Sequence, residues 1–135
     1  MTILRDTHGH ILVCHTAINN EADLIRLAIR EGVDLRGANL AGLDLSGMDL
    51  SHLDLSFANL TGATLIGTNL KRSLLKRANF CSADMKGTDL SHCDVRGAMF
   101  TEALFDGETS FRDVIYLGSE FEAATLPKVA VAAAR

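Results

Sequence analysis

An apolar residue recurs at every fifth position through the middle of this chain, and no other feature constrains the fold as strongly. The recurring positions, called centres below, are Leu35, Leu40, Leu45, Leu50, Leu55, Leu60, Leu65, Leu70, Leu75, Phe80, Met85, Leu90, Val95, Phe100 and Phe105. An α-helix repeats its apolar positions with a period of 3.6 and a β-strand with a period of 2, so neither accounts for this spacing. Self-similarity at a fixed period indicates a solenoid, in which each short repeat packs on its neighbours.

The positions around each centre repeat as well. Two residues before the centre stands a mostly small residue, as at Ala38, Ala58, Ala63, Ala78, Ala83, Ala98 and Ala103. Asp or Asn directly precedes most centres, as at Asp34, Asn39, Asp44, Asp49, Asp54, Asn59, Asn69, Asn79, Asp84, Asp89 and Asp94. Two residues after it comes Gly in about half of the units, as at Gly37, Gly42, Gly47, Gly62, Gly67, Gly87, Gly97 and Gly107. Gly and Asn tolerate the backbone angles of tight turns, so each unit reads as a short segment followed by a corner.

These units resemble the pentapeptide repeat family, whose pattern A-(D/N)-L-x-x they match from residue 33 to residue 107. The resemblance implies an all-β solenoid: a right-handed quadrilateral β-helix with four repeats per coil, whose centres and small residues point inward. The repeats then make about four coils, stacked at roughly 4.8 Å. We expect one domain over residues 1–135, divided into an N-terminal cap (1–32), the β-helix (33–107) and a C-terminal cap (108–135).

An open solenoid exposes strand edges and core at both ends, so caps are expected there. Residues 2–15 predict a hairpin, and residues 20–31 predict a helix with Asn19 or Asn20 as N-cap and Gly32 as its stop. After Phe105 the five-residue register breaks, and Ser119 with Glu122 predicts a short helix over 120–126. Apolar side chains gather in this C-terminal part, and some members of the family dimerise there. We therefore expect a homodimer contact made by Phe111, Ile115, Tyr116, Leu117 and Phe121.

One cluster of possible metal ligands, His8, His10, Cys14 and His15, lies in the predicted hairpin. The ligand types suit zinc, but Cys14 and His15 are adjacent and so point to opposite faces of a strand. A polar turn beside a buried cysteine explains the same residues, and we predict no metal and no cofactor. The chain holds 3 cysteines without framework spacing, which indicates a reducing, cytoplasmic location.

Catalysis is not expected from this sequence. His52 and His92 lie two coils apart on the predicted coil, and the aspartates point outward once per unit, so no acid–base pair converges. A convex rod also lacks the concave pocket that catalysis uses. The net charge of -4 argues against direct nucleic-acid binding, and no apolar run is long enough to cross a membrane.

The most individual surface feature is a basic patch of Lys71, Arg72, Lys76 and Arg77, placed at one corner of the coil. Phe57 and Leu74 occupy outward positions nearby and add apolar anchors. Ordinary solvated charge would explain the four cations equally well. Read as a binding surface, the patch suits an acidic protein partner.

The sequence therefore predicts a non-enzymatic, cytoplasmic protein-binding module. We expect it to inhibit or modulate a bacterial or phage-encountered nucleic-acid-handling machine. One alternative is a DNA mimic that binds type II topoisomerase, as the family resemblance implies, with gyrase inhibition or protection as its effect. A metal-bound or redox-sensing module and an effector delivered into another cell also stay open, because a solenoid recognises partners through its summed surface.

Overall fold

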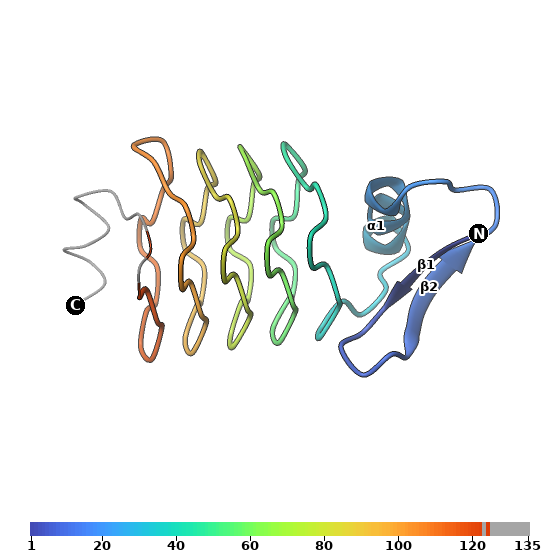
Figure 1. Ribbon diagram of the computed structural model, residues 1–135, viewed down its shortest axis with the longest axis horizontal. Helices are drawn as coiled ribbons and strands as arrows, with labels where there is room; N and C mark the ends of the chain where they lie inside the picture. The colour runs from blue at the N-terminus through green and yellow to red at the C-terminus, as the bar shows by residue number, and fades with distance from the viewer. Residues whose placement is uncertain (123, 125–135) are drawn as a thin grey trace.

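In the computed structural model, a hairpin and a helix lie at one end of a row of stacked coils (Figure 1). The structure describes residues 1–122 and residue 124. The named elements are β1 (Thr2–Arg5), β2 (Ile11–His15) and α1 (Glu21–Arg30). In the described part, no helix has the length and apolar character that a membrane crossing needs.

The predicted N-terminal hairpin is present. β1 and β2 pair antiparallel, with Thr2 opposite His15 and Ile3 opposite Cys14. The Asp6 carboxylate accepts from the backbone N–H groups of His8 and His10, each at 2.9 Å, and this closes the turn.

The predicted helix is also present, with Asn20 as its N-cap. The Asn20 side chain accepts from the Asp23 N–H at 2.8 Å, and Gly32 follows the C-cap with φ +69°. Leu24, Ile25 and Ala28 form the buried face of α1 and belong to the same core cluster as the repeat centres.

The hairpin is joined to the first coil by backbone hydrogen bonds. The Asn39 N–H donates to the Arg5 carbonyl at 2.8 Å, and the Thr7 N–H donates to the Gly37 carbonyl at 2.9 Å. The backbone edge of the first coil, which would otherwise face solvent, is thereby paired at these points.

Each coil takes twenty residues and pairs with the next in parallel. Bridges join Asn39 to Asn59 and Asn59 to Asn79, and the same offset recurs on the other faces. Each face of the coil is so short that the pairing forms single bridges instead of extended strands. Residues twenty apart therefore stack in columns along the rod, and this geometry positions every surface feature below.

The centres fill the interior as the repeat predicts. Those from Leu40 to Phe100 are at most 1% exposed. On one face the rings of Phe80, Phe100 and Phe121 form a continuous stack, with centroids 5.0 Å and 4.7 Å apart.

Polar side chains at the small positions form hydrogen bonds between successive coils. These bonds were not predicted from the sequence. The Thr68 hydroxyl donates to the Leu45 carbonyl at 2.8 Å, and the Ser73 hydroxyl donates to the Leu50 carbonyl at 2.7 Å. Both hydroxyls are buried, so these bonds satisfy groups that would otherwise cost free energy in the interior.

The solenoid does not stop at residue 107. One extra residue between 106 and 109 shifts the pairing offset to 21, and Ser110, Ile115 and Glu120 then bridge to the coil before them. The Asp106 carboxylate accommodates the insertion by accepting from the N–H groups of Glu108 and Thr109.

The short helix expected over 120–126 is therefore not formed in the described residues of that segment. Ser119 does not cap a helix, because its hydroxyl donates to the Val95 carbonyl one coil below, at 2.6 Å. Glu120 is held in extended backbone by its bridge to Met99. Residues 123 and 125–135, which include the rest of the expected helix, lie outside the described part.

Candidate protein-binding surface

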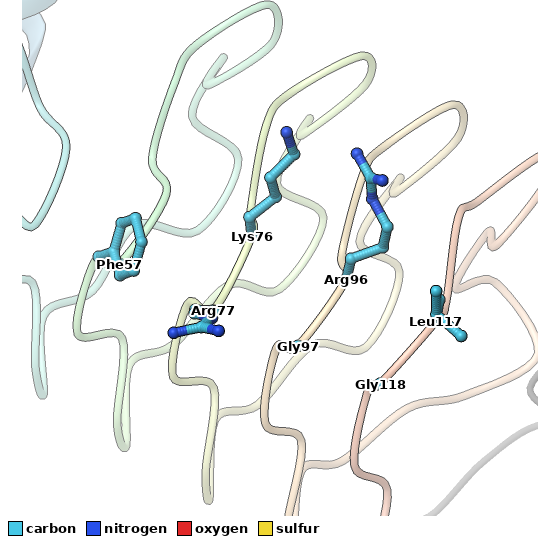
Figure 2. A pocket seen from close by; sticks show the side chains of 7 residues that line it. All are labelled: Phe57, Lys76, Arg77, Arg96, Gly97, Leu117 and Gly118. Carbon is cyan, nitrogen blue, oxygen red and sulfur yellow. The ribbon is translucent and has the colours of Figure 1, made fainter.

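The two residues after each centre form a corner between two faces of the rod. After Leu55, Leu75, Val95 and Tyr116, one such corner carries the pairs Ser56–Phe57, Lys76–Arg77, Arg96–Gly97 and Leu117–Gly118. The backbone ladder holds these pairs in register: the Phe57 N–H donates to the Lys76 carbonyl, and the Arg77 N–H donates to the Arg96 carbonyl, both at 2.9 Å. Figure 2 shows the residues of this corner, except Ser56, on successive coils.

A groove of about 550 Å³ runs along this corner. We call it the corner groove. It is lined by Phe57, Lys76, Arg77, Arg96, Gly97, Leu117 and Gly118. The two glycines keep its floor low. A Cβ added at Gly97 would lie 3.0 Å from Cγ of Arg77, closer than side chains normally pack.

The charge in the groove is predominantly positive. Arg96 makes a two-point contact with Asp94, with nitrogen–oxygen distances of 2.6 and 2.9 Å, and Lys76 Nζ lies 3.7 Å from the same carboxylate. The hydrogen bond from Arg96 lowers the pKa of Asp94 against the opposing effect of its burial. Arg77 forms no ion pair with any residue in the described part. The groove therefore holds three cations, and the one carboxylate beside it, Asp94, contacts only Arg96 and Lys76.

Exposed apolar side chains gather at the same place. Phe57 is 58% exposed and Leu117 is 80% exposed at the two ends of the groove. On the adjoining face, Leu74 and Ile115 lie on either side of Asp94 in one column and are 42% and 51% exposed. These four are half of the eight large apolar residues exposed in the described part. Exposed apolar side chains are therefore concentrated on this side of the rod.

The four predicted cations do not share one corner. Lys71 and Arg72 follow Leu70 and occupy the preceding corner, because units five residues apart turn onto successive faces. Lys71 lies 3.8 Å from Asp89, and the backbone of Arg72 lies between the backbones of His52 and His92 in its column. The prediction of one basic corner is therefore wrong in detail: two basic corners border the face that carries Leu74.

Backbone strain is concentrated on these two corners. Among the described residues, eight other than glycine adopt positive φ, and these corners hold six of them: His52, Phe57, Arg72, Arg77, His92 and Asp113. Such a conformation costs a side-chain-bearing residue about 1–2 kcal/mol, and glycine would avoid most of that cost. The chain keeps side chains there at a cost in stability, which is common at functional surfaces.

Arg96, Gly97 and Gly118 were not among the predicted site residues, and Leu117 was predicted at the dimer contact. The sequence could have indicated Arg96, because a residue twenty positions after Lys76 stacks directly above it in the coil. Lys86, in contrast, lies on another corner, 3.8 Å from Asp84.

The candidate metal ligands do not converge. His10 Nδ1 contacts Asp6 at 2.8 Å, and this hydrogen bond is the largest cause that lowers the pKa of Asp6. His15 Nδ1 accepts from the Ala17 N–H at 3.1 Å, and Cys14 is exposed. In residues 1–122 and 124, no three His, Cys, Asp or Glu side chains could hold one metal ion.

The cysteines are unpaired and sit in different environments. Cys93 is buried, as predicted for an inward position, and its thiol donates to the Leu70 carbonyl at 2.8 Å. Burial raises the pKa of Cys93 to about 12, which keeps it protonated and unreactive. Cys81 is half-buried, and Cys14, expected to be buried in the hairpin, is exposed.

The residues expected at a dimer contact divide into two groups. Phe111 is buried, and Tyr116 and Phe121 are half-buried, because all three are centres of the continued coil. Burial raises the pKa of Tyr116 to about 12, and its hydroxyl has no hydrogen-bond partner in the described chain. Ile115 and Leu117 do face outward. The dimer itself stays a prediction.

Comparison with known proteins agrees with the coil geometry. A family model described as Pentapeptide repeats matches residues 31–65 and 58–97, with 8 copies of the repeat. The match and the twenty-residue register together support a right-handed quadrilateral β-helix. No curated protein matches the chain significantly.

Several solved structures resemble the chain. A pentapeptide repeat protein from Nostoc PCC 7120 is 29% identical over 78% of this chain and 98% of its own, with a TM-score of 0.33. One from the thylakoid lumen of Arabidopsis thaliana is 28% identical over 70% of this chain and 75% of its own, with a TM-score of 0.31. HetL, a pentapeptide repeat protein from Nostoc sp. strain PCC 7120 involved in heterocyst differentiation regulation, is 27% identical over 67% of this chain and 45% of its own, with a TM-score of 0.35.

Proposed function

This chain belongs to the pentapeptide repeat family, and on that premise we propose that it is a non-enzymatic module that binds a protein partner through one side of its rod. The binding surface comprises the face that carries Leu74 and the two corners with Lys71, Arg72, Lys76 and Arg77. The partner we propose is an acidic surface on a bacterial or phage-encountered nucleic-acid-handling machine, which the module inhibits or modulates.

One observation carries the proposal: exposed apolar side chains and cations occur together on this side. Protein interfaces combine apolar and aromatic anchors with arginine, whereas an ordinary solvated face does not collect large apolar residues. Phe57 and Leu74 supply the anchors, and Arg77 supplies a cation without an ion-pair partner in the described chain.

The same proposal assigns roles to the rest of the molecule. The hairpin and α1 act as the N-terminal cap of the coil, since they pair its edge and share its core. The C-terminal end, where Ile115 is exposed, is the proposed homodimer contact, and Leu117 lines the corner groove instead. We place the protein in the cytoplasm because its unpaired cysteines suit a reducing compartment.

Affinity capture with charge reversal tests the proposal. Tagged full-length protein captures partners from bacterial lysate, beside a variant with Lys71, Arg72, Lys76 and Arg77 changed to Glu. A control variant changes Arg5, Arg26, Arg30 and Lys86 to Glu, an equal charge reversal at positions outside this face and its two corners. We expect the wild type and the control to retain a partner that the first variant loses; retention by the first variant would contradict the proposal.

A DNA mimic is the second candidate, because two acidic columns lie outside the face that carries Leu74. Asp44 and Asp84 share one column, and Asp49 and Asp89 share another. Lys86 and Lys71 lie within 3.8 Å of Asp84 and Asp89, which interrupts the negative stripe. Capture of a type II topoisomerase that survives reversal of the basic residues would favour the mimic.

A further inference from the structure

We propose that the corner groove binds an extended acidic segment of about five residues with an apolar side chain at each end. This inference rests on the proposed function and specifies the partner chemistry that one part of the surface would recognise. The length of the groove, the order of its lining residues and their charge favour such a segment.

The length of the groove sets the length of the segment. From Phe57 through Arg77 and Gly97 to Gly118 the corner climbs three coils. At about 4.8 Å per coil this span is roughly 14 Å, and an extended chain rises about 3.3 Å per residue. Four to five residues therefore cover it.

The order of the lining residues sets the pattern of the segment. Phe57 lies at one end and Leu117 at the other, while Lys76, Arg77 and Arg96 lie between them (Figure 2). Apolar side chains of the partner would cover Phe57 and Leu117, and carboxylates would meet the cations.

The charge balance requires acidic residues in the middle of the segment. Asp94 already binds Arg96 in two contacts and lies near Lys76, so it compensates one of the three cations. Two positive charges remain uncompensated beside exposed apolar surface. Charge-assisted hydrogen bonds from arginine to carboxylate are stronger than neutral ones, so an acidic segment gains most here.

The floor of the groove lets a backbone approach. Phe57 and Arg77 adopt positive φ, so this position of the coil can hold a residue with a side chain. The next two coils nevertheless have Gly97 and Gly118 at the same position. With no Cβ at these levels, the partner backbone would lie close to the coil.

Two other occupants fit less well. A nucleic-acid backbone would place phosphates beside the Asp94 carboxylate and would leave Phe57 and Leu117 without apolar partners. The C-terminal residues of this chain carry Lys128 and Arg135 and no acidic residue after Glu122, so their charge is of the wrong sign.

An NMR titration tests the inference. The ¹⁵N-labelled full chain is titrated with the acetylated and amidated peptide leucine–triglutamate–leucine, and with a control peptide in which glutamine replaces all three glutamates. We expect saturable shifts centred on the amides of Arg77, Gly97 and Gly118, and an affinity about tenfold or more lower for the control peptide.

Three variants locate the site. Leu117→Ser changes an exposed side chain without touching the core, and Arg77→Gln removes the cation that has no described ion-pair partner; each should weaken binding several-fold. Arg36→Gln is the matched control, because Arg36 shares the Lys76 column but pairs with Asp34 outside the groove, and it should bind like the wild type.

The inference is overturned if no saturable shift occurs, if both peptides bind equally, or if a single-stranded oligonucleotide shifts the same amides at lower concentration. These results are separable from the proposed function. A failed titration with intact, corner-dependent partner capture removes only the peptide inference, whereas capture that ignores the corner removes the proposed function.

Discussion

The rings of Phe80 and Phe100, twenty residues apart in the chain, stack with centroids 5.0 Å apart and planes 4° apart. Both side chains are fully buried. The stack shows how this solenoid is stabilised: each coil packs its centres directly on the equivalent centres of the next coil. A substitution in one coil is therefore felt in both neighbours.

Truncation of Phe100 should strongly destabilise the fold. Phe100→Ala removes stacking on Phe80 and Phe121 and leaves a cavity, which typically costs about 3–5 kcal/mol. Phe100→Leu keeps most of the volume and should cost markedly less. Urea unfolding followed by circular dichroism measures both, with exposed Phe57→Ala as control. Equal stability of Phe100→Ala and wild type would contradict the inward register.

The buried thiol of Cys93 should act as a hydrogen-bond donor between coils. Cys93→Ala removes the bond to the Leu70 carbonyl, while Cys93→Ser can restore a donor as Ser73 does one coil below. We expect the alanine variant to lose about 0.5–1.5 kcal/mol and the serine variant to lose less. Denaturant unfolding decides the order, and a serine variant less stable than the alanine variant would show that the bond contributes nothing.

The three thiols should react with a disulfide reagent at very different rates. At pH 8 Cys93 stays protonated because burial holds its pKa at about 12, whereas Cys14 is exposed. Mass spectrometry of the native protein should find Cys14 modified first and Cys93 unmodified until unfolding. Early labelling of Cys93 would mean that the coil opens there.

Low pH should reduce the stability that the Asp94 carboxylate gives to the folded state. The pKa of Asp94 lies below its ordinary value of 3.8, chiefly because of Arg96, so its carboxylate stabilises the folded state above that pH. This contribution is lost as pH falls through the lowered pKa. Asp94→Asn should cost roughly 1.5–3 kcal/mol at pH 7, and this cost should shrink as pH falls below 3.8. A cost that is independent of pH would indicate lost packing instead.

The five-residue period predicted the interior of the rod because burial follows from spacing alone. It also contained the C-terminal continuation: Phe111, Tyr116 and Phe121 are again five apart, displaced by the single residue inserted after Phe105. Because the inserted residue interrupts the period, the β-helix was predicted to end there. The residues after it were therefore predicted to form a helix and a dimer contact, although the aromatic ones are centres of a further coil.

The candidate site was harder to predict. Lys71 and Lys76 are only five residues apart but lie on successive corners, whereas Lys76 and Arg96 are twenty residues apart and share a column. The groove also depends on where Arg77 lies relative to Gly97 and on the ion pairs of Asp94. Those contacts arise from side-chain packing, and the repeat pattern does not contain them.

Photo-crosslinking from opposite faces tests the central claim most directly. Leu74 and Leu104 are equivalent outward leucines on opposite faces, 42% and 39% exposed, and each can be replaced by benzoylphenylalanine without touching the core. We predict that the protein substituted at position 74 cross-links to the captured partner and that the protein substituted at position 104 does not. Cross-linking from position 104 alone would contradict the account and move the binding surface to the acidic side of the rod.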